Sequence, residues 1–325
     1  MAPLHTIVLS MTLTQLNVFV LVARLGSVTA AANALSVSEP AVSQALTALR
    51  QHLGDQLVVR GPGGMTLTPG GSRLLSTASQ IVALGAEAQA AVRAAQGAPE
   101  QLRLVATSTI AEFAVSPVLE AFTRRLSGGV QVSSGVAADS EMAVLVANRL
   151  ADVALGAASM RDPQLQVTSE PVFRYKMVVV TSAQAKPRGP ASQWLWLVDP
   201  SGTDPDSDSG RMLRALRVPD ARVRVFPNQT AAWAAAADGS GVAPAASHLV
   251  AQQLRRGELC VLTLPGTPMD ACWHVITLNR EHRPVAAGSL RHFLGTPEAM
   301  QLMRSPTEGM PPSRFRPPVY VTIWS

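Results

Sequence analysis

Hydrophobic residues recur at helical spacing in three short segments near the N-terminus. In the first segment, Leu16 and Phe19 belong to a stripe of apolar residues three or four positions apart, and Gly26 ends it. Ser27 is a natural N-cap for the second segment, which is rich in alanine and runs to about Leu35. The pattern therefore predicts two consecutive helices with a tight connection.

A third helix is predicted to begin at Ser38, which caps it, and to end at Gly54. Its apolar side consists of Val42, Ala45, Leu46, Leu49 and Leu53. Its other side carries short polar or small residues, namely Glu39, Pro40, Ser43, Gln44 and Thr47. Three helices in this order, with a turn before the last, are typical of domains that place a helix in the DNA major groove. The alternative is a small helical bundle whose outer face is merely solvated.

A glycine-rich segment, Gly61-Pro62-Gly63-Gly64, follows between two short extended runs and predicts a hairpin that forms a wing. A long helix is then predicted from 69 to 95. Its apolar and small residues recur at steps of three and four: Leu74, Leu75, Ala78, Ile81, Val82, Gly85, Ala88 and Val92. Alone, such a stripe could pack on its own domain. Residues 96–101 read as a hinge.

From 102 onward, short apolar runs alternate with helical patterns, which predicts an α/β architecture with largely parallel sheets. Strands are predicted at 102–106, 130–133, 152–155, 176–180, 195–198, 222–226 and 259–264. Helices are predicted at 112–126, 140–150, 211–216, 230–237 and 245–255. Residues 301–325 form a proline-rich tail with a strand-like run at 319–324.

Hydroxyl-bearing loops follow several of these strands. Open α/β sheets bind ligands beyond the carboxyl ends of their strands. This rule selects Thr107, Ser108 and Thr109 in one loop, Ser201 and Thr203 in another, and Asn228 before a later helix. Hydroxyls and the N–H groups of helix N-termini favour a polar or acidic ligand. The alternative for each residue is that it only caps a helix.

Composition narrows the classes of function. The 325 residues are 47% hydrophobic, enough for about two domains, and the net charge of +5 suits a polyanionic partner. No apolar run of membrane-spanning length and no signal peptide is evident, so we expect a cytoplasmic protein without membrane contact. Asp204, Asp206 and Asp208 alternate but lack the glycine and glutamate of a calcium loop, which predicts a solvated acidic loop. Cys260 and Cys272 read as buried reduced thiols.

No nucleophile, phosphate-binding or dinucleotide motif is present, and the histidines lack zinc spacing. We therefore expect no enzymatic activity, no cofactor and no metal.

Residues from Met11 to about Arg93 resemble the N-terminal region of LysR-type transcriptional regulators. The matching residues are Leu16, Phe19, Gly26, Ser27, Ala31, Ala32, Ala34, Leu35, Val37, Ser38, Pro40, Ala41, Ser43, Leu49, Leu53, Gly54, Leu57, Arg60, Leu67, Thr68 and Gly70. The resemblance implies an α+β multidomain protein. A winged helix-turn-helix (11–68) would be followed by a dimerising linker helix (69–95), and then by a two-lobed α/β effector-binding domain (102–300) similar to periplasmic binding proteins. The second lobe of that domain would lie at about 181–265.

The chain also departs from the family pattern. Glu39 stands where Gln is common, Gln44 where Arg is common, and the wing lacks the usual basic residues. The expected DNA-contacting residues are Ser38, Glu39, Pro40, Ser43, Gln44, Thr47, Arg50 and Arg60. The resemblance implies a regulator that binds double-stranded DNA as a homodimer or homotetramer and responds to a small effector. The alternative is a solute-binding or enzymatic α/β protein with a fused helical domain.

Overall fold

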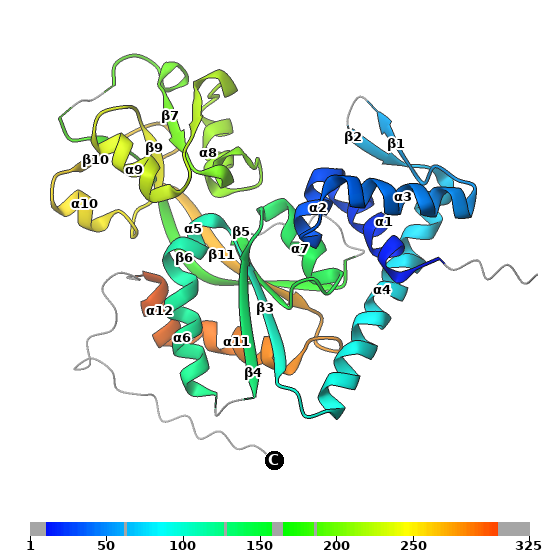
Figure 1. Cartoon of the computed structure of the whole chain (residues 1–325). Helices are drawn as coiled ribbons and strands as arrows, with labels where there is room; N and C mark the ends of the chain where they lie inside the picture. The colour runs from blue at the N-terminus through cyan, green and yellow to red at the C-terminus, as the bar shows by residue number, and fades with distance from the viewer. Residues whose placement is uncertain (1–10, 62–63, 127–128, 158–164, 185–186, 305–325) are drawn as a thin grey trace, which may run out of the picture.

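The computed structural model describes residues 11–61, 64–126, 129–157, 165–184 and 187–304. Three parts follow one another along the chain: a small N-terminal helical domain, one long helix, and a larger two-lobed domain (Figure 1). The predicted strand at 319–324 and the first ten residues lie outside the described residues. Among the described residues, no helix has both the length and the hydrophobicity needed to cross a membrane.

The N-terminal domain has the predicted order of elements. Its helices are α1 (Leu13–Leu25), α2 (Val28–Leu35) and α3 (Glu39–Leu53), and its hairpin pairs β1 (Val58–Gly61) with β2 (Gly64–Leu67). Thr12 and Gln15 form a capping box at the start of α1, and Ser27 caps α2 through its hydroxyl. Gly26 and Gly54 end α1 and α3 in the left-handed conformation that glycine adopts without strain. Leu53, predicted to face the core, is 40% exposed.

The long helix α4 (Pro69–Ala95) is continuous and begins at Thr68, whose hydroxyl accepts a hydrogen bond from the Gly71 N–H group. It packs along α1, and the residues that it buries are Gly71, Ala78 and Val82. Ile81 and Val92 of the predicted stripe remain 37% and 58% exposed, and Leu84, which lies outside that stripe, is 63% exposed. One part of the predicted stripe therefore packs inside the chain, and another part is open to a further contact.

A mixed sheet runs through both lobes of the larger domain. Its strands are β3 (Glu100–Ala106), β4 (Val130–Val136), β5 (Val153–Ala157), β6 (Val167–Ser182), β9 (Ala243–Ala246), β10 (Leu259–Leu262) and β11 (Met269–Leu278). The order is β10-β6-β11-β5-β3-β4, with β9 also paired to β6. Because β3 begins at Glu100, the hinge between α4 and the sheet is shorter than the predicted 96–101.

The prediction of largely parallel sheets is wrong for the strands that join the lobes. Strands β3, β4 and β5 are parallel, but β6 and β11 pair antiparallel with each other over most of their length. The chain passes along β6 from the lobe that contains β3, β4 and β5 (lobe 1) to the lobe that contains β9 and β10 (lobe 2), and it returns along β11. These two neighbours must therefore run in opposite directions. A register shift between Trp273 and His274 marks the place where β11 crosses between the lobes.

Helices cover both faces of the sheet in lobe 1. They are α5 (Ser108–Ile110), a π-helical turn (Ala111–Val115), α6 (Ser116–Arg125), α7 (Asp139–Ala147), α11 (Val285–Leu294) and α12 (Pro297–Arg304). Helices α11 and α12 were not predicted, and α12 extends the domain beyond residue 300, where a tail was expected. Phe122, Phe293 and Leu290 lie in the core that these helices share with the sheet.

Lobe 2 is built from β7 (Trp196–Val198), β8 (Val223–Val225), β9, β10, α8 (Asp208–Ala215), α9 (Gln229–Ala237) and α10 (Ala251–Arg255). Strands β7 and β8 are parallel. The helix predicted at 245–255 is wrong at its start, because Ala245 and Ala246 belong to β9, which pairs with Met177–Val180 of β6. Alanine favours helix by intrinsic propensity, and the tertiary strand pairing overrides it here.

Candidate functional sites

The exposed face of α3 carries the residues predicted to reach DNA. Ser43, Gln44 and Thr47 are exposed, whereas Val42, Leu46 and Leu49 are buried against the rest of the domain. The Thr47 hydroxyl donates a 2.8 Å hydrogen bond to the Ser43 carbonyl oxygen of its own helix. Of the three polar side chains, Gln44 has the longest reach, and its amide can both donate and accept.

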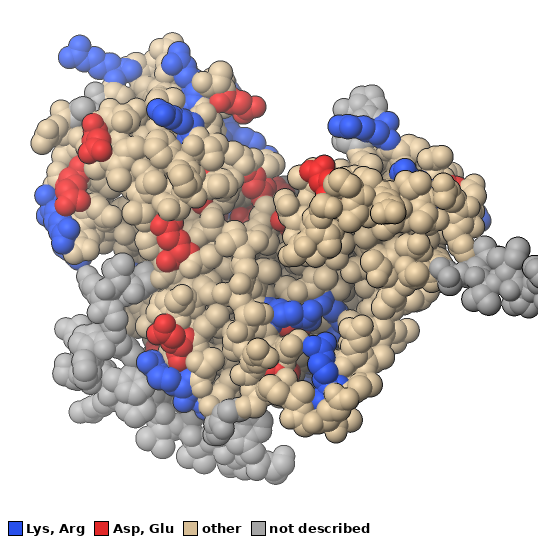
Figure 2. Space-filling view, in the orientation of Figure 1, with Lys and Arg blue, Asp and Glu red and all other residues tan. Residues whose placement is uncertain are grey.

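Two N–H groups of the Arg50 guanidinium form hydrogen bonds within the domain. Its Nε donates to the Gln56 carbonyl oxygen and its Nη2 to the Val58 carbonyl oxygen, both at 2.7 Å. These bonds tie the end of α3 to the first strand of the wing, so Arg50 positions the wing. Arg60 lies exposed on β1. Figure 2 shows basic atoms beside the wing, while uncharged side chains cover most of the visible face of this domain.

The start of α3 is organised by short polar contacts. Glu39 lies in the first turn, where its charge is favourable to the helix dipole, and accepts a 2.8 Å hydrogen bond from the Thr29 hydroxyl of α2. Ser38 is the N-cap residue by backbone conformation, although its side chain makes no capping hydrogen bond. Ser38, Glu39 and Pro40 are all exposed. The predicted DNA-contacting residues other than Arg50 thus share one exposed surface around α3 and the wing.

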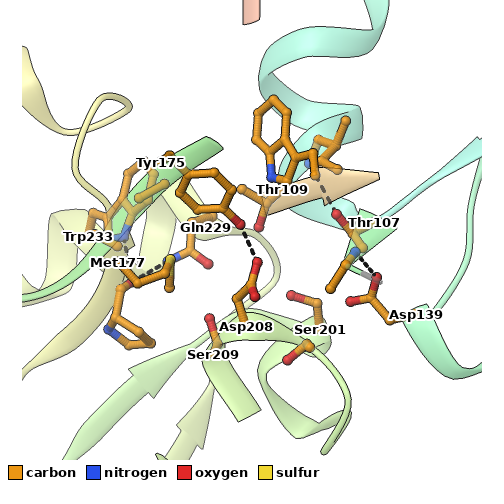
Figure 3. A pocket seen from close by; sticks show the side chains of 17 residues that line it. Thr107, Thr109, Asp139, Tyr175, Met177, Ser201, Asp208, Ser209, Gln229 and Trp233 are labelled. Atoms are coloured by element: carbon orange, nitrogen blue, oxygen red, sulfur yellow. Dashed lines mark hydrogen bonds between the residues drawn. The ribbon is translucent and has the colours of Figure 1, made fainter. Parts of the chain in front are cut away.

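A small cavity of about 40 Å³ lies between the two lobes (Figure 3). Thr107 and Thr109 line it from lobe 1, and Ser201 lines it from lobe 2. A cavity of this volume holds a few water molecules at most, since one water needs at least about 10–15 Å³ on this measure. A larger ligand therefore requires the lobes to move apart before they close on it.

The other three predicted residues do not line the cavity, and their side chains form hydrogen bonds within the protein. The Ser108 hydroxyl donates to Asp199, a fully buried carboxylate that also accepts a 2.8 Å bond from Ser201. The Thr203 hydroxyl donates to the Pro200 carbonyl oxygen at 2.7 Å. Asn228 caps α9 by accepting the Ala231 N–H at 2.8 Å. For Thr203 and Asn228, the structure shows the helix-capping or turn role that was the alternative interpretation. Thr107 also caps a helix, because its hydroxyl accepts a 3.4 Å hydrogen bond from the Ile110 N–H group, while its side chain lines the cavity.

Two carboxyl groups that the sequence did not predict to line a binding site face the cavity from opposite lobes. Asp139 begins α7 in lobe 1 and is 3% exposed, and Asp208 begins α8 in lobe 2 and is 9% exposed. Burial raises the pKa of Asp139 from 3.8 to about 7, and the charge of Asp208 adds to this effect, whereas the Ala157 N–H bond opposes it. Burial also raises the pKa of Asp208, against the opposing effects of Tyr175 and Arg211.

The prediction that residues 204–208 form a solvated acidic loop is wrong. Asp204, Asp206 and Asp208 are each only 9% exposed, because the segment folds against lobe 1. Asp204 accepts hydrogen bonds from the Ser140 N–H and hydroxyl groups of lobe 1, at 3.1 and 3.2 Å. The acidic segment therefore joins the two lobes. The described residues contain no group of side chains arranged to hold a metal ion.

A further polar contact joins the lobes at the start of α9. Glu112 of lobe 1 accepts the backbone N–H groups of Gln229 and Thr230, at the start of α9, at 3.1 and 3.3 Å. With the Ser108–Asp199 and Ser140–Asp204 bonds, this gives polar contacts between lobes at three places. The arrangement is a closed one.

Aromatic and amide side chains complete the cavity. Tyr175, Trp233 and Trp273 line it, and the Gln229 side chain amide and the Trp233 indole N–H both donate to the Pro244 carbonyl oxygen at 3.1 Å. These residues carry no local sequence signal, since they come from strands and a helix far apart along the chain. Cys260 and Cys272, predicted to be buried thiols, are free and half-buried, and neither lines this cavity.

Comparisons with known proteins agree with this organisation. A family model described as the bacterial regulatory helix-turn-helix protein of the LysR family matches residues 13–72, and one described as the LysR substrate binding domain matches residues 95–296. An uncharacterized HTH-type transcriptional regulator of Mycobacterium tuberculosis is 33% identical and aligns over 97% of this chain and 100% of its own length. The regulator CfxR of Cupriavidus necator is 28% identical over 88% of this chain and 91% of its own.

Solved structures share the fold. A full-length OxyR variant from Pseudomonas aeruginosa superimposes with a TM-score of 0.54 at 17% identity, covering 90% of this chain and 97% of its own. A full-length AphB variant gives 0.52 at 18% identity, covering 88% and 98%. The chain therefore belongs to the LysR family of transcriptional regulators, non-enzymatic proteins that combine a DNA-binding helix-turn-helix domain with an effector-binding domain.

Proposed function

We propose that a small polar molecule binds in the cavity between the lobes and controls how the protein binds DNA. The observation that carries this proposal is the cavity between the lobes, which Thr107 and Thr109 of lobe 1 and Ser201 of lobe 2 line together. A ligand that contacts both lobes stabilises their closed arrangement. It shifts the protein between conformations only to the extent that it prefers one of them.

The carboxyl groups of Asp139 and Asp208 limit which kinds of effector the cavity can bind. The sequence predicted a polar or acidic ligand, but Asp139 and Asp208 face the cavity from the two lobes. When ionised, Asp208 would repel a negative charge and attract a hydrogen-bond donor or a positively charged nitrogen, whereas Asp139, whose pKa burial raises to about 7, can accept a hydrogen bond in either protonation state. The described lining residues include no lysine or arginine. We therefore favour a polar effector that presents donor groups to these two carboxyls.

The exposed face of α3 is the proposed reading surface. Ser43 and Gln44 are exposed and lie opposite the buried stripe, and Gln can bond adenine through two hydrogen bonds. Because few basic residues lie in this domain, affinity would depend on two or more reading helices acting together. The exposed residues Leu84 and Val92 of α4 fit a contact with a second copy of the chain, giving a homodimer or homotetramer. We place this activity in the cytoplasm, where bacterial DNA lies.

Fluorescence anisotropy with DNA from the region upstream of the protein's own coding sequence tests the DNA-binding half of the proposal. Gln44→Ala should weaken specific binding by about 1–3 kcal/mol at fixed salt and leave the melting temperature nearly unchanged. Gln51→Ala, at another exposed position of the same helix, is the matched control and should bind like the wild type. Equal affinity of Gln44→Ala and the wild type would exclude this reading surface.

A further inference from the structure

Helix α1 is buried around its whole circumference. Val18, Phe19, Val20, Leu21 and Val22 are consecutive, and none is more than 3% exposed. Since an α-helix turns about 100° per residue, five consecutive side chains point in all directions. Helices α2, α3 and α4 cover part of this surface. The remainder is covered by α7 of the effector-binding domain, which packs against α1 and shares one continuous hydrophobic core with it.

One residue of α7 identifies the face that meets α1. Met142 packs against Gly156 of β5, and Val146, four positions later, lies on the same side of the helix. Val144 is two residues from each, about 200° around the helix, so it points away from the sheet. It is nevertheless only 6% exposed. Outside the sheet, α1 packs most extensively on α7, and Val144 belongs to the hydrophobic core that these two helices share; Figure 1 shows α7 between the sheet and the N-terminal helices.

The two ends of α7 have separate attachments. Just after its C-terminal end, Arg149 forms an ion pair with Glu87 of α4 and donates a 3.4 Å hydrogen bond to the His282 carbonyl oxygen. The Arg149 side chain is 13% exposed. At the N-terminal end, Asp139 lines the cavity between the lobes and is 3% exposed. A single short helix thus touches the cavity, the DNA-binding domain and the linker helix.

We propose that α7 docks the DNA-binding domain onto the effector-binding domain of the same chain and transmits the state of the cavity to it. A short helix moves as a rigid body. A displacement of its N-terminal end at Asp139 therefore also displaces the side chains that pack against α1. Such a contact has discrete arrangements and does not deform smoothly. By linkage, a cavity ligand that favours one docking arrangement is itself bound more tightly in that arrangement. The docking does not depend on the proposed effector, whereas the transmission rests on it.

The docking can be tested in the full-length protein by amide hydrogen exchange. Val144→Glu places a charge in the contact and should release α1, so that the α1 amides exchange about tenfold faster while β3 and β5 keep their protection. Val144→Ala is the matched control, with a smaller change in the same direction. Unchanged exchange in α1 would overturn the docking. Loss of protection in β3 and β5 together with α1 would also overturn it, unless a second variant that leaves the core residues unchanged speeds exchange in α1 alone.

That second variant is Glu87→Gln, which removes the ion pair with Arg149 and leaves every core residue in place. It should speed exchange in α1 without lowering the protection of β3 or β5. If Val144→Glu unfolds lobe 1 and Glu87→Gln leaves α1 unchanged, the docking is refuted.

Transmission is tested by changing the cavity end of α7. Asp139→Asn should alter α1 exchange by about threefold or more in the otherwise wild-type chain, and should have no effect on α1 once Val144→Glu or Glu87→Gln has released the contact. If Asp139→Asn in the otherwise wild-type chain leaves amide exchange in α1 unchanged, transmission is overturned. Equal responses in both backgrounds would also overturn it, because the signal would then bypass α7. The proposed effector function is judged separately, by ligand-dependent DNA binding.

Discussion

The hydroxyl of Tyr175, on the crossover strand β6, donates a hydrogen bond to the carboxylate of Asp208 at the start of α8 (Figure 3). Arg211 holds the same carboxylate from the other side through an ion pair. Asp208 is therefore kept in a fixed position at the cavity by one neutral and one charged donor. Burial raises the pKa of the Tyr175 phenol well above its usual value of 10, so the phenol stays a donor at neutral pH.

Tyr175→Phe removes this bond while keeping the ring that packs near Trp273. Since a hydrogen bond to a charged group contributes about 1.5–3 kcal/mol, the free energy of unfolding should fall by that order at pH 8. Urea denaturation provides the measurement. A second aromatic pair, Phe122 and Phe293, lies away from the cavity, and Phe122→Leu should lower stability without affecting ligand binding. Unchanged stability in Tyr175→Phe would contradict the role assigned to the bond.

Asp139 makes stability fall as the pH rises. Its pKa is 3.8 in the unfolded chain and about 7 in the folded protein, so between these values the folded state holds a proton that the unfolded state has released. The resulting loss, complete by about pH 7, is of the order of 4 kcal/mol. Asp139→Asn carries no charge and should remove this loss. Melting temperatures from pH 4 to 8 should therefore converge at low pH and favour the variant at high pH; parallel curves would argue against a buried, protonated Asp139.

His248 acts in the opposite direction. Its ring lies edge-on to Phe173, Tyr175 and Trp273, and both ring nitrogens are buried without a hydrogen-bond partner among the described residues. Burial lowers its pKa from 6.5 to about 4, so stability is lost as the pH falls from about 6.5 to 4. His248→Phe keeps an aromatic ring and should lose this acid sensitivity in the same melting series. An unchanged slope between pH 4 and 6.5 would show that the imidazole is hydrated or bonded in solution.

The exposed side of α4 is expected to form the contact between copies of the chain. Leu84 is 63% exposed, and Ile81, one turn earlier, is 37% exposed. Leu84→Asp would place a charge in a buried interface and should dissociate the oligomer to monomers, as measured by light scattering at micromolar concentration. Leu53→Asp, at an exposed leucine of α3, is the control and should leave the oligomer intact. A monomeric wild-type protein would refute the interface.

Local features of the sequence were sufficient for the DNA-binding domain. The caps at Ser27 and Gly54, and the stripe through Val42 and Leu46, act within one helix, so periodicity and capping chemistry predicted these elements. The prediction failed where a residue's role depends on distant contacts. Leu53 has the spacing of the core stripe, but it lies at the end of α3 beyond the reach of the core.

The cavity was only partly predictable for the same reason. Loop positions after strands identified Thr107 and Ser201. Asp208 was mistaken for part of a solvated loop because nothing in residues 204–208 shows that the segment folds against lobe 1. Asp139 and Tyr175 come from different elements and meet Asp208 only when the lobes are joined by β6 and β11. No local pattern encodes that meeting.

The central claim is that occupation of the cavity controls DNA binding, and anisotropy on the upstream DNA tests it most directly. A thermal-shift screen of polar metabolites first identifies a compound that stabilises the wild type. That compound should change the DNA affinity of the wild type. Thr107→Val, which loses one cavity hydroxyl but keeps its shape, should bind DNA normally without the compound and respond to it weakly. A full response by Thr107→Val, or a bound-ligand structure with the compound outside the cavity between the lobes, would contradict the account.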